Sequence, residues 1–193
     1  MFLRKAALRI PDYATVDAHF IDAVESKLEQ EETLQASLDA GYRDLDRRQP
    51  VLSGWLSDEL SVAKDETVQS LGYFLIICVY LAFREAFPKR LGTIDEPALR
   101  LSAETFAVDE ELRANDPLEA LESDDVIAIT QPSMISFIQH HVQEALEQGE
   151  ASDEELDIDE LDRVYRTVLV QVIALSQAVS APAGALSAKH ALH

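Results

Sequence analysis

The sequence predicts an all-α fold, a single-domain helical bundle of about six or seven helices around a central apolar helix. Two apolar patterns carry this prediction. The longest apolar run, residues 71–83, would be apolar on every side of a helix, which is typical of a helix surrounded by others. Residues 158–179 repeat apolar side chains at alternating spacings of three and four, the period of a helix that packs along one side. A chain of 193 residues, 47% of them hydrophobic, can bury such a core without metals or disulfides.

Two apolar periods lie near the N-terminus. Residues 15–28 have apolar side chains every four residues, and either Asp12 or Thr15 is suited to cap the resulting helix. Residues 34–45 continue with the same period. They either extend the first helix or form a second one, since Gly41 permits a local break.

The central helix is predicted over about residues 65–87, after a short helix at 51–62 that packs Trp55 on the core. Asp65 is suited to cap the central helix, and the Phe87-Pro88 pair is suited to end it. A buried β-strand is the alternative for a short apolar run. The length of the segment and the polar helix formers at both ends favour the helix.

The patterns after the central helix differ in clarity. A helix is predicted over about residues 102–113, although its apolar residues alternate in both two-residue and helical senses. Residues 125–130 are either helix or a strand-like connector, but no other segment offers a clear β partner. Residues 131–148 carry one helical apolar stripe, with Pro132 in the first turn and Gly149 at the stop.

The last predicted helix spans residues 157–180. A capping pattern formed by Asp157 and Glu160 marks its start. The small residues that follow give little to bury, so residues 181–193 are predicted to form a loosely ordered tail. The predicted helical domain therefore covers residues 1–180.

The acidity of the chain is concentrated in residues 93–162. They include 21 Asp and Glu but only two basic side chains, Arg100 and Arg113, while the whole chain has a formal net charge of −20. A surface of this charge repels nucleic acid and anionic membranes and attracts cations or basic protein surfaces. The acidic stretch is either a solvated face that maintains solubility, a docking surface, or an adaptation to high salt.

Composition and segment lengths predict a cytoplasmic protein. The single cysteine, Cys78, cannot form an intramolecular disulfide and lies in the apolar run, where burial should make its thiol unreactive. Arg9 and Pro11 interrupt the apolar stretch that a signal peptide would need. The 13-residue apolar run is shorter than the roughly 20 residues of a membrane span. The excess of arginine over lysine suggests a bacterial source.

Four residues are the candidates for metal binding: His19, His140, His141 and Glu144. A di-iron bundle would need a glutamate three residues before a ligating histidine, and none of these histidines has one. His140 and His141 are adjacent on a predicted helix, so their side chains point about 100° apart and cannot face one ion. We interpret them as an exposed His140–Glu144 pair and a His141 at the edge of the apolar stripe. His19 either pairs with Asp22 or is solvated, so no metal site or cofactor is predicted.

Motifs for catalysis are missing from the sequence. It contains no Gly-x-Ser-x-Gly, no glycine-rich phosphate loop and no calcium-binding loop. Its 36 acidic residues guarantee chance carboxylate pairs, so such a pair has no specificity as a sign of an active site.

The predicted function is that of a non-enzymatic cytoplasmic interaction or regulatory protein whose 93–162 region docks a basic protein partner. The candidate contact residues are Glu150, Asp153, Glu154 and Glu155. One alternative is a metal-dependent or hydrolytic enzyme, with a site of His and Asp or Glu in a pocket of the bundle. Another is a structural homo-oligomer formed through the 157–180 helix, with an acidic face that is only solvated.

Overall fold

The computed structural model describes residues 9–30, 34–115, 122–152 and 156–183, and within these ranges it is helical. The described residues form no β-strand, apart from an isolated bridge between Leu91 and Val179. A short 3₁₀ helix at Asp12–Ala14 precedes eight α-helices: α1 (Ala18–Gln30), α2 (Leu34–Arg48), α3 (Pro50–Ser61), α4 (Glu66–Ala86), α5 (Glu96–Ala114), α6 (Ser123–Thr130), α7 (Pro132–Ser152) and α8 (Ile158–Ala178). The predicted all-α, single-domain fold is confirmed, with eight helices in these ranges in place of about six or seven.

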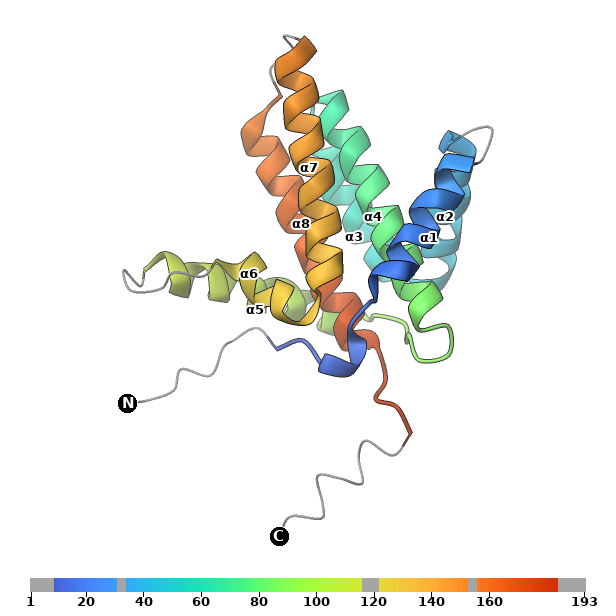
Figure 1. Ribbon diagram of the computed structural model, residues 1–193. Helices are drawn as coiled ribbons and strands as arrows, with labels where there is room; N and C mark the ends of the chain where they lie inside the picture. Colours follow the sequence, from blue (N-terminus) through green and yellow to red (C-terminus); the bar gives the residue numbers. More distant parts are fainter. Residues whose placement is uncertain (1–8, 31–33, 116–121, 153–155, 184–193) are drawn as a thin grey trace.

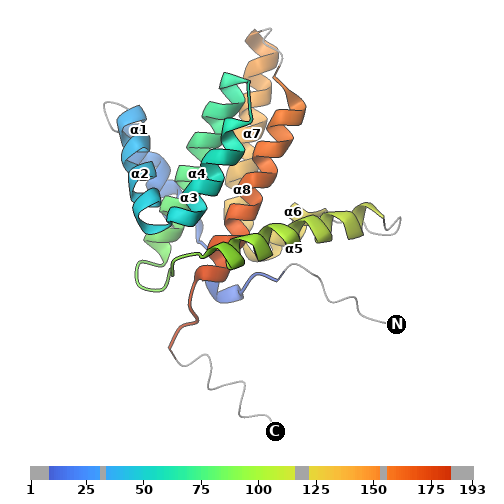
Figure 2. The ribbon, with the colours of Figure 1, turned by 180° about the vertical axis from the view of Figure 1, so that it is seen from behind.

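The helices are arranged around α4. It contacts α1, α2, α3, α7 and α8, which makes it the central helix, as predicted. On one side of α4 lie α7 and α8, and on the other the α1–α2 pair diverges from them toward one end of the bundle (Figure 1). At the opposite end α5 and α6 lie next to each other across the bundle and project to one side (Figures 1 and 2).

α4 begins and ends where its sequence predicts. The Asp65 carboxylate accepts hydrogen bonds from the backbone N–H groups of Thr67 and Val68, and the helix stops at Ala86 before Phe87. By length and apolar composition, α4 could also cross a membrane. However, 56% of its most apolar 18-residue window is buried against the other helices, as in a core helix.

α8 is a second core helix. The sequence predicts a seam along one side, but between Val164 and Ser176 nearly every side chain of α8 is buried. The buried polar side chains in this stretch bond to other groups of the bundle, except for the Oε1 of Gln171, which has no partner among the described residues. For example, the Gln171 amide donates to the backbone carbonyl of Ile76 on α4, at 2.8 Å. Ile158 in the first turn, 59% exposed, is the large apolar residue that α8 leaves on the surface.

The N-terminal helices correct the predicted cap and settle an alternative that the sequence left open. α1 begins only at Ala18, so Asp12 and Thr15 lie in and after the preceding 3₁₀ helix and do not cap it. α2 is a separate helix, and it continues through Gly41 without a break. Gly41 instead lets α2 approach α4 closely, because a Cβ atom there would lie 2.6 Å from the Cγ2 of Ile77.

Two of the later helices, α5 and α7, are longer than predicted. α5 starts at Glu96 and not near residue 102, because Asp95 caps it and Pro97 fits its first turn. α7 passes Gly149 and ends at Ser152. Residues 125–130, left open between helix and strand, belong to α6. The predicted tail lies mostly outside the described residues, which end at residue 183.

A buried glutamine links three segments of the bundle by hydrogen bonds. Gln131, between α6 and α7, donates through its amide to the carbonyl of Ala14 at 2.6 Å and to the hydroxyl of Ser176 at 3.0 Å. Its side-chain oxygen accepts from the backbone N–H of Val16 at 3.0 Å. One fully buried side chain thus joins the N-terminal segment, the α6–α7 junction and α8.

The first turns of α4 and α8 cap each other. Asp157 caps its own helix by accepting from the N–H of Glu160, as predicted. The Glu160 carboxylate does not return to Asp157 as in an ordinary capping box; it accepts from the N–H groups of Lys64 and Asp65 at 2.8 Å. Asp65 in turn accepts from the N–H of Asp157 at 3.1 Å. This N–H, and more weakly those of Val68 and Thr67, lower the pKa of Asp65 despite its partial burial.

We expect Asp65→Asn to lower the free energy of unfolding by about 1 kcal/mol, because the amide retains only one acceptor oxygen for three N–H groups. Urea denaturation followed by circular dichroism measures the change. Asp58→Asn is the matched control, on an exposed side chain of α3, and should change stability by less than about 0.5 kcal/mol. Equal effects of the two substitutions would contradict mutual capping.

Candidate functional site

The acidic region, residues 93–162, spans several helices. Its residues are distributed over α5, α6, α7 and the start of α8, and several carboxylates bind neighbouring helices. Asp109 on α5 is 3% exposed and accepts from Arg113 at 2.6 Å and from the Ser123 hydroxyl at 2.8 Å. Glu110 pairs with Arg166 of α8. These carboxylates hold the α5–α6 arm together and to the bundle, so they are not available to a partner.

The predicted contact cluster is only partly described. Glu150 is exposed near the end of α7, and within the described residues its side chain makes no hydrogen bond or ion pair. The other three members, Asp153, Glu154 and Glu155, lie outside the described residues. The prediction that these four carboxylates form one contact surface is therefore still a prediction.

A different surface of the acidic region combines charge with exposed apolar groups. Leu101, Val108 and Leu112 on α5 are 58%, 48% and 47% exposed. Their positions repeat at spacings of seven and four, which places them along one side of the helix. Glu104 and Glu111 are exposed on the same side. We call these five residues the α5 outer face.

The charges on the α5 outer face have few internal partners. Glu104 lies 3.8 Å from Arg100 in an exposed pair, which contributes little binding energy in water. Within the part of the chain that the structure describes, the Glu111 side chain makes no hydrogen bond or ion pair. The apolar residues of α5 can be read from the sequence, but their periodicity over residues 99–112 is ambiguous. It therefore does not distinguish the buried residues of α5, such as Phe106, from the exposed ones on the outer face.

The candidate histidines lie apart. His19 is exposed on α1 and stacks on Phe20 with ring centroids 3.9 Å apart. His140 is exposed on α7 and borders a shallow pocket next to α1. His141 points into another cleft. Among the described residues, no group of three or more His, Cys, Asp or Glu side chains is placed to hold a metal ion.

His141, and not His140, has carboxylate neighbours. Its Nε2 lies 3.0 Å from the Oε1 of Glu25 on α1, and its Nδ1 lies 3.6 Å from the Oε2 of Glu144. The predicted His140–Glu144 pair is thus replaced by a His141–Glu144 contact. The imidazole also packs edge-on against Phe74 and Phe137, at centroid distances of 5.0 and 4.6 Å. His141 sits at the edge of the apolar stripe, as predicted.

A cleft of about 830 Å³ lies between α2, α3, α4 and α7, and we call it the His141 cleft. Buried Leu38 and Leu60 contribute its apolar lining, together with Phe74. Tyr42 and Tyr73 also line it, with ring centroids 5.7 Å apart. Burial, reinforced by a hydrogen bond from the Tyr73 hydroxyl to Asp39, raises the pKa of Tyr73 to about 12, so its phenol stays protonated at neutral pH.

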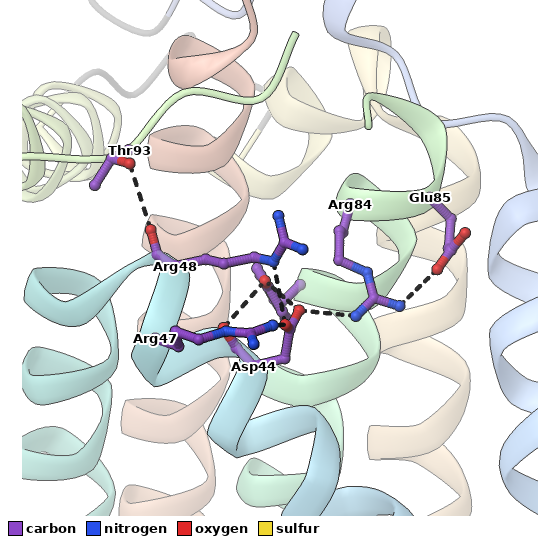
Figure 3. Close-up of polar contacts among 7 residues, drawn as sticks. Asp44, Arg47, Arg48, Arg84, Glu85 and Thr93 are labelled. Atoms are coloured by element: carbon purple, nitrogen blue, oxygen red, sulfur yellow. Dashed lines mark hydrogen bonds and ion pairs between the residues drawn. The ribbon is translucent and has the colours of Figure 1, made fainter. Parts of the chain in front are cut away.

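A cluster of charged side chains joins α2 to α4 near the opposite end of these helices. The Asp44 carboxylate accepts from the Tyr80 hydroxyl and from Arg84, both at 2.8 Å, and from Arg47 and Arg48 of its own helix (Figure 3). Partial burial on its own would raise the pKa of Asp44, but these hydrogen bonds outweigh it and hold the pKa well below its ordinary value. This Asp44 cluster is structural, because the arginines are already bound to the protein's own carboxylate.

Cys78 is unsuited to nucleophilic chemistry. It is buried in α4, and this burial, with a further contribution from the negative charge of Glu25, raises the pKa of its thiol. A protonated, inaccessible thiol is a poor nucleophile. The sequence predicts that Cys78 is buried, and the structure confirms it.

The described residues therefore offer two surfaces suited to binding, the α5 outer face and the His141 cleft. Neither has the paired nucleophile and base, or the convergent ligands, that would define an active site. Comparisons of the chain with protein-family models, with curated proteins and with solved structures found no match.

Proposed function

We propose that the protein is a cytoplasmic, non-enzymatic interaction or regulatory protein that docks a basic protein partner on its acidic region, residues 93–162. The observation that carries this proposal is the α5 outer face. Three large apolar side chains in helical register are costly to leave in water, and such exposed stripes are typical of sites where a partner helix packs.

The charges around the stripe define the chemistry of the partner. Glu104 and Glu111 flank Val108 by one turn on either side, so a partner helix needs Lys or Arg beside its own apolar residues. Arg113, the other basic residue of this region besides Arg100, is bound to Asp109. The net −20 charge of the chain accelerates the approach of a basic partner, while the apolar stripe supplies short-range packing.

The test uses a synthetic amphipathic helix with leucines at alternating spacings of three and four and lysines beside them, labelled for fluorescence anisotropy. We expect it to bind and to dissociate as salt is raised. Val108→Ser with Leu112→Ser should weaken binding about tenfold at every salt concentration, because packing is lost. Glu104→Gln with Glu111→Gln should weaken binding mainly at low salt and flatten the salt dependence.

Two controls locate the site. Val62→Ser removes an equally exposed apolar residue beyond the end of α3, and it should leave binding unchanged. Glu150→Gln tests the end of α7. Binding that is lost with Glu150→Gln and not with the α5 variants would place the partner at the predicted acidic cluster. Binding that none of these variants reduces would contradict docking on α5, and the acidic region would then serve solubility.

A further inference from the structure

The His141 cleft has the dimensions of a small-molecule site. Its volume of about 830 Å³ falls within the roughly 300–1,000 Å³ of ligand pockets. On α4 the lining extends from Thr67 to Phe74, which is about 10 Å of helix at about 1.5 Å per residue. The cleft is also separate from the α5 outer face, since no residue of α5 lines it.

The lining provides an apolar and aromatic surface. Leu38 and Leu60 are buried at its wall, and Phe74 lies beside them. The two phenol rings of Tyr42 and Tyr73 are tilted by 35° to each other at a centroid distance of 5.7 Å. Aromatic faces placed together attract cations through their quadrupoles and also stack on flat or alkyl groups.

The charges around the cleft are those of an acidic site. Glu144 lines it from α7, and Asp39 lies behind Tyr73, whose hydroxyl donates to it at 3.2 Å. His141 carries at most one positive charge, against the two carboxylates of Glu25 and Glu144 beside it. Among the described residues, no Lys or Arg lines the cleft. An anionic ligand would therefore find no fixed cationic partner here.

We propose that the His141 cleft binds a small organic cation with an apolar body. The ammonium group lies over the tyrosine pair near Glu144, and the apolar body packs against Leu38, Leu60 and Phe74. The aromatic faces contribute a cation–π attraction that a neutral or anionic ligand of the same shape does not have. This site is independent of the proposed docking on α5, and either can fail without the other.

The test compares two probes that share a 4-phenylbutyl group as their apolar body, 4-phenylbutyltrimethylammonium and 5-phenylpentanoate, by calorimetric titration of the full chain. We expect the cation to bind at least about tenfold more tightly than the anion. Ser70→Trp fills the cleft from an exposed position of α4 and should abolish binding of the cation. Glu144→Gln should weaken the cation about threefold or more and should not weaken the anion.

The control is Ser26→Trp, which places the same bulky side chain on an exposed position of α1 outside the cleft. It should bind the cation as the unmodified chain does. Circular dichroism melting confirms that both tryptophan variants are folded. Lack of cation binding, equal affinity for the two probes, or cation binding that survives Ser70→Trp would each overturn the proposal.

Discussion

Gly72→Val should lower the free energy of unfolding by about 3 kcal/mol, one of the two largest effects that we expect from a single substitution. Gly72 lies on α4 where Leu60 of α3 and Val164 of α8 pack closely against it. A Cβ atom at this position would stand 2.5 Å from the Cδ2 of Leu60 and 2.8 Å from the Cγ1 of Val164. To avoid the new side chain, Leu60 would have to rotate out of its buried position. Val164 is branched at Cβ and has few alternative rotamers on a helix, so it cannot easily move aside.

The matched substitution is Gly54→Ala, on the exposed side of α3. A Cβ atom at residue 54 meets nothing within 4 Å, so only the helix propensity of alanine matters. This variant should be more stable than the unmodified chain by about 0.5–1 kcal/mol. Guanidinium denaturation of both variants gives the comparison. If Gly72→Val unfolded at the same denaturant concentration as the unmodified chain, the close contact of α3, α4 and α8 would be wrong.

Asp44→Ala should destabilise the protein by about 3 kcal/mol at neutral pH. Its carboxylate is the shared acceptor for the Tyr80 hydroxyl and the Arg84 guanidinium across the α2–α4 interface. Without it, the guanidinium groups that Asp44 holds together repel one another, and Tyr80 loses its better acceptor. A double-mutant cycle with Tyr80→Phe should give a coupling energy on the order of 1 kcal/mol. Additive effects of the two substitutions would contradict a direct interaction.

The Asp44 contribution should also depend on pH. Its pKa in the folded protein lies below that of an unfolded aspartate, which is about 3.9. The unfolded state therefore binds more protons in acid, so this stabilisation is complete above about pH 4 and is lost as the pH falls toward the folded-state pKa. The difference in stability between Asp44→Ala and the unmodified chain should shrink over that range. A difference that stayed constant from pH 7 to pH 2 would show that packing, and not charge, makes Asp44 important.

Local patterns in the sequence were sufficient where the determinant lies within one helix. Asp65 is followed directly by the helix that it caps, and the alternating spacings of residues 158–179 require only the helical period. The α5 helix was predicted too short because its early apolar residues are partly exposed, which blurs its periodicity. Leu101 is on the surface while Leu99 is buried, and the pattern does not distinguish them.

Contacts between distant residues could not be read from local patterns. Arg84 meets Asp44 only because α2 and α4 pack side by side, and the sequence indicates only that arginines near helix ends find acidic partners. The His141 cleft depends on the divergence of α2 from α7, which no spacing encodes. The contact between His141 and Glu25 likewise depends on how α1 packs against α7.

The hydrogen bonds of the Gln131 amide join residues that the ribosome synthesises at very different times. Ala14 and Ser176 both accept hydrogen bonds from the Gln131 amide, yet Ser176 follows Ala14 by 162 residues in the chain, so it is synthesised much later. At about 5–20 residues per second, ribosomes take on the order of ten seconds or more to connect these two points. Throughout that interval the N-terminal segment has emerged without its final partners. The nascent chain therefore completes these hydrogen bonds only once α8 has been released, so a ribosome that stalls before α8 leaves Gln131 without its Ser176 partner.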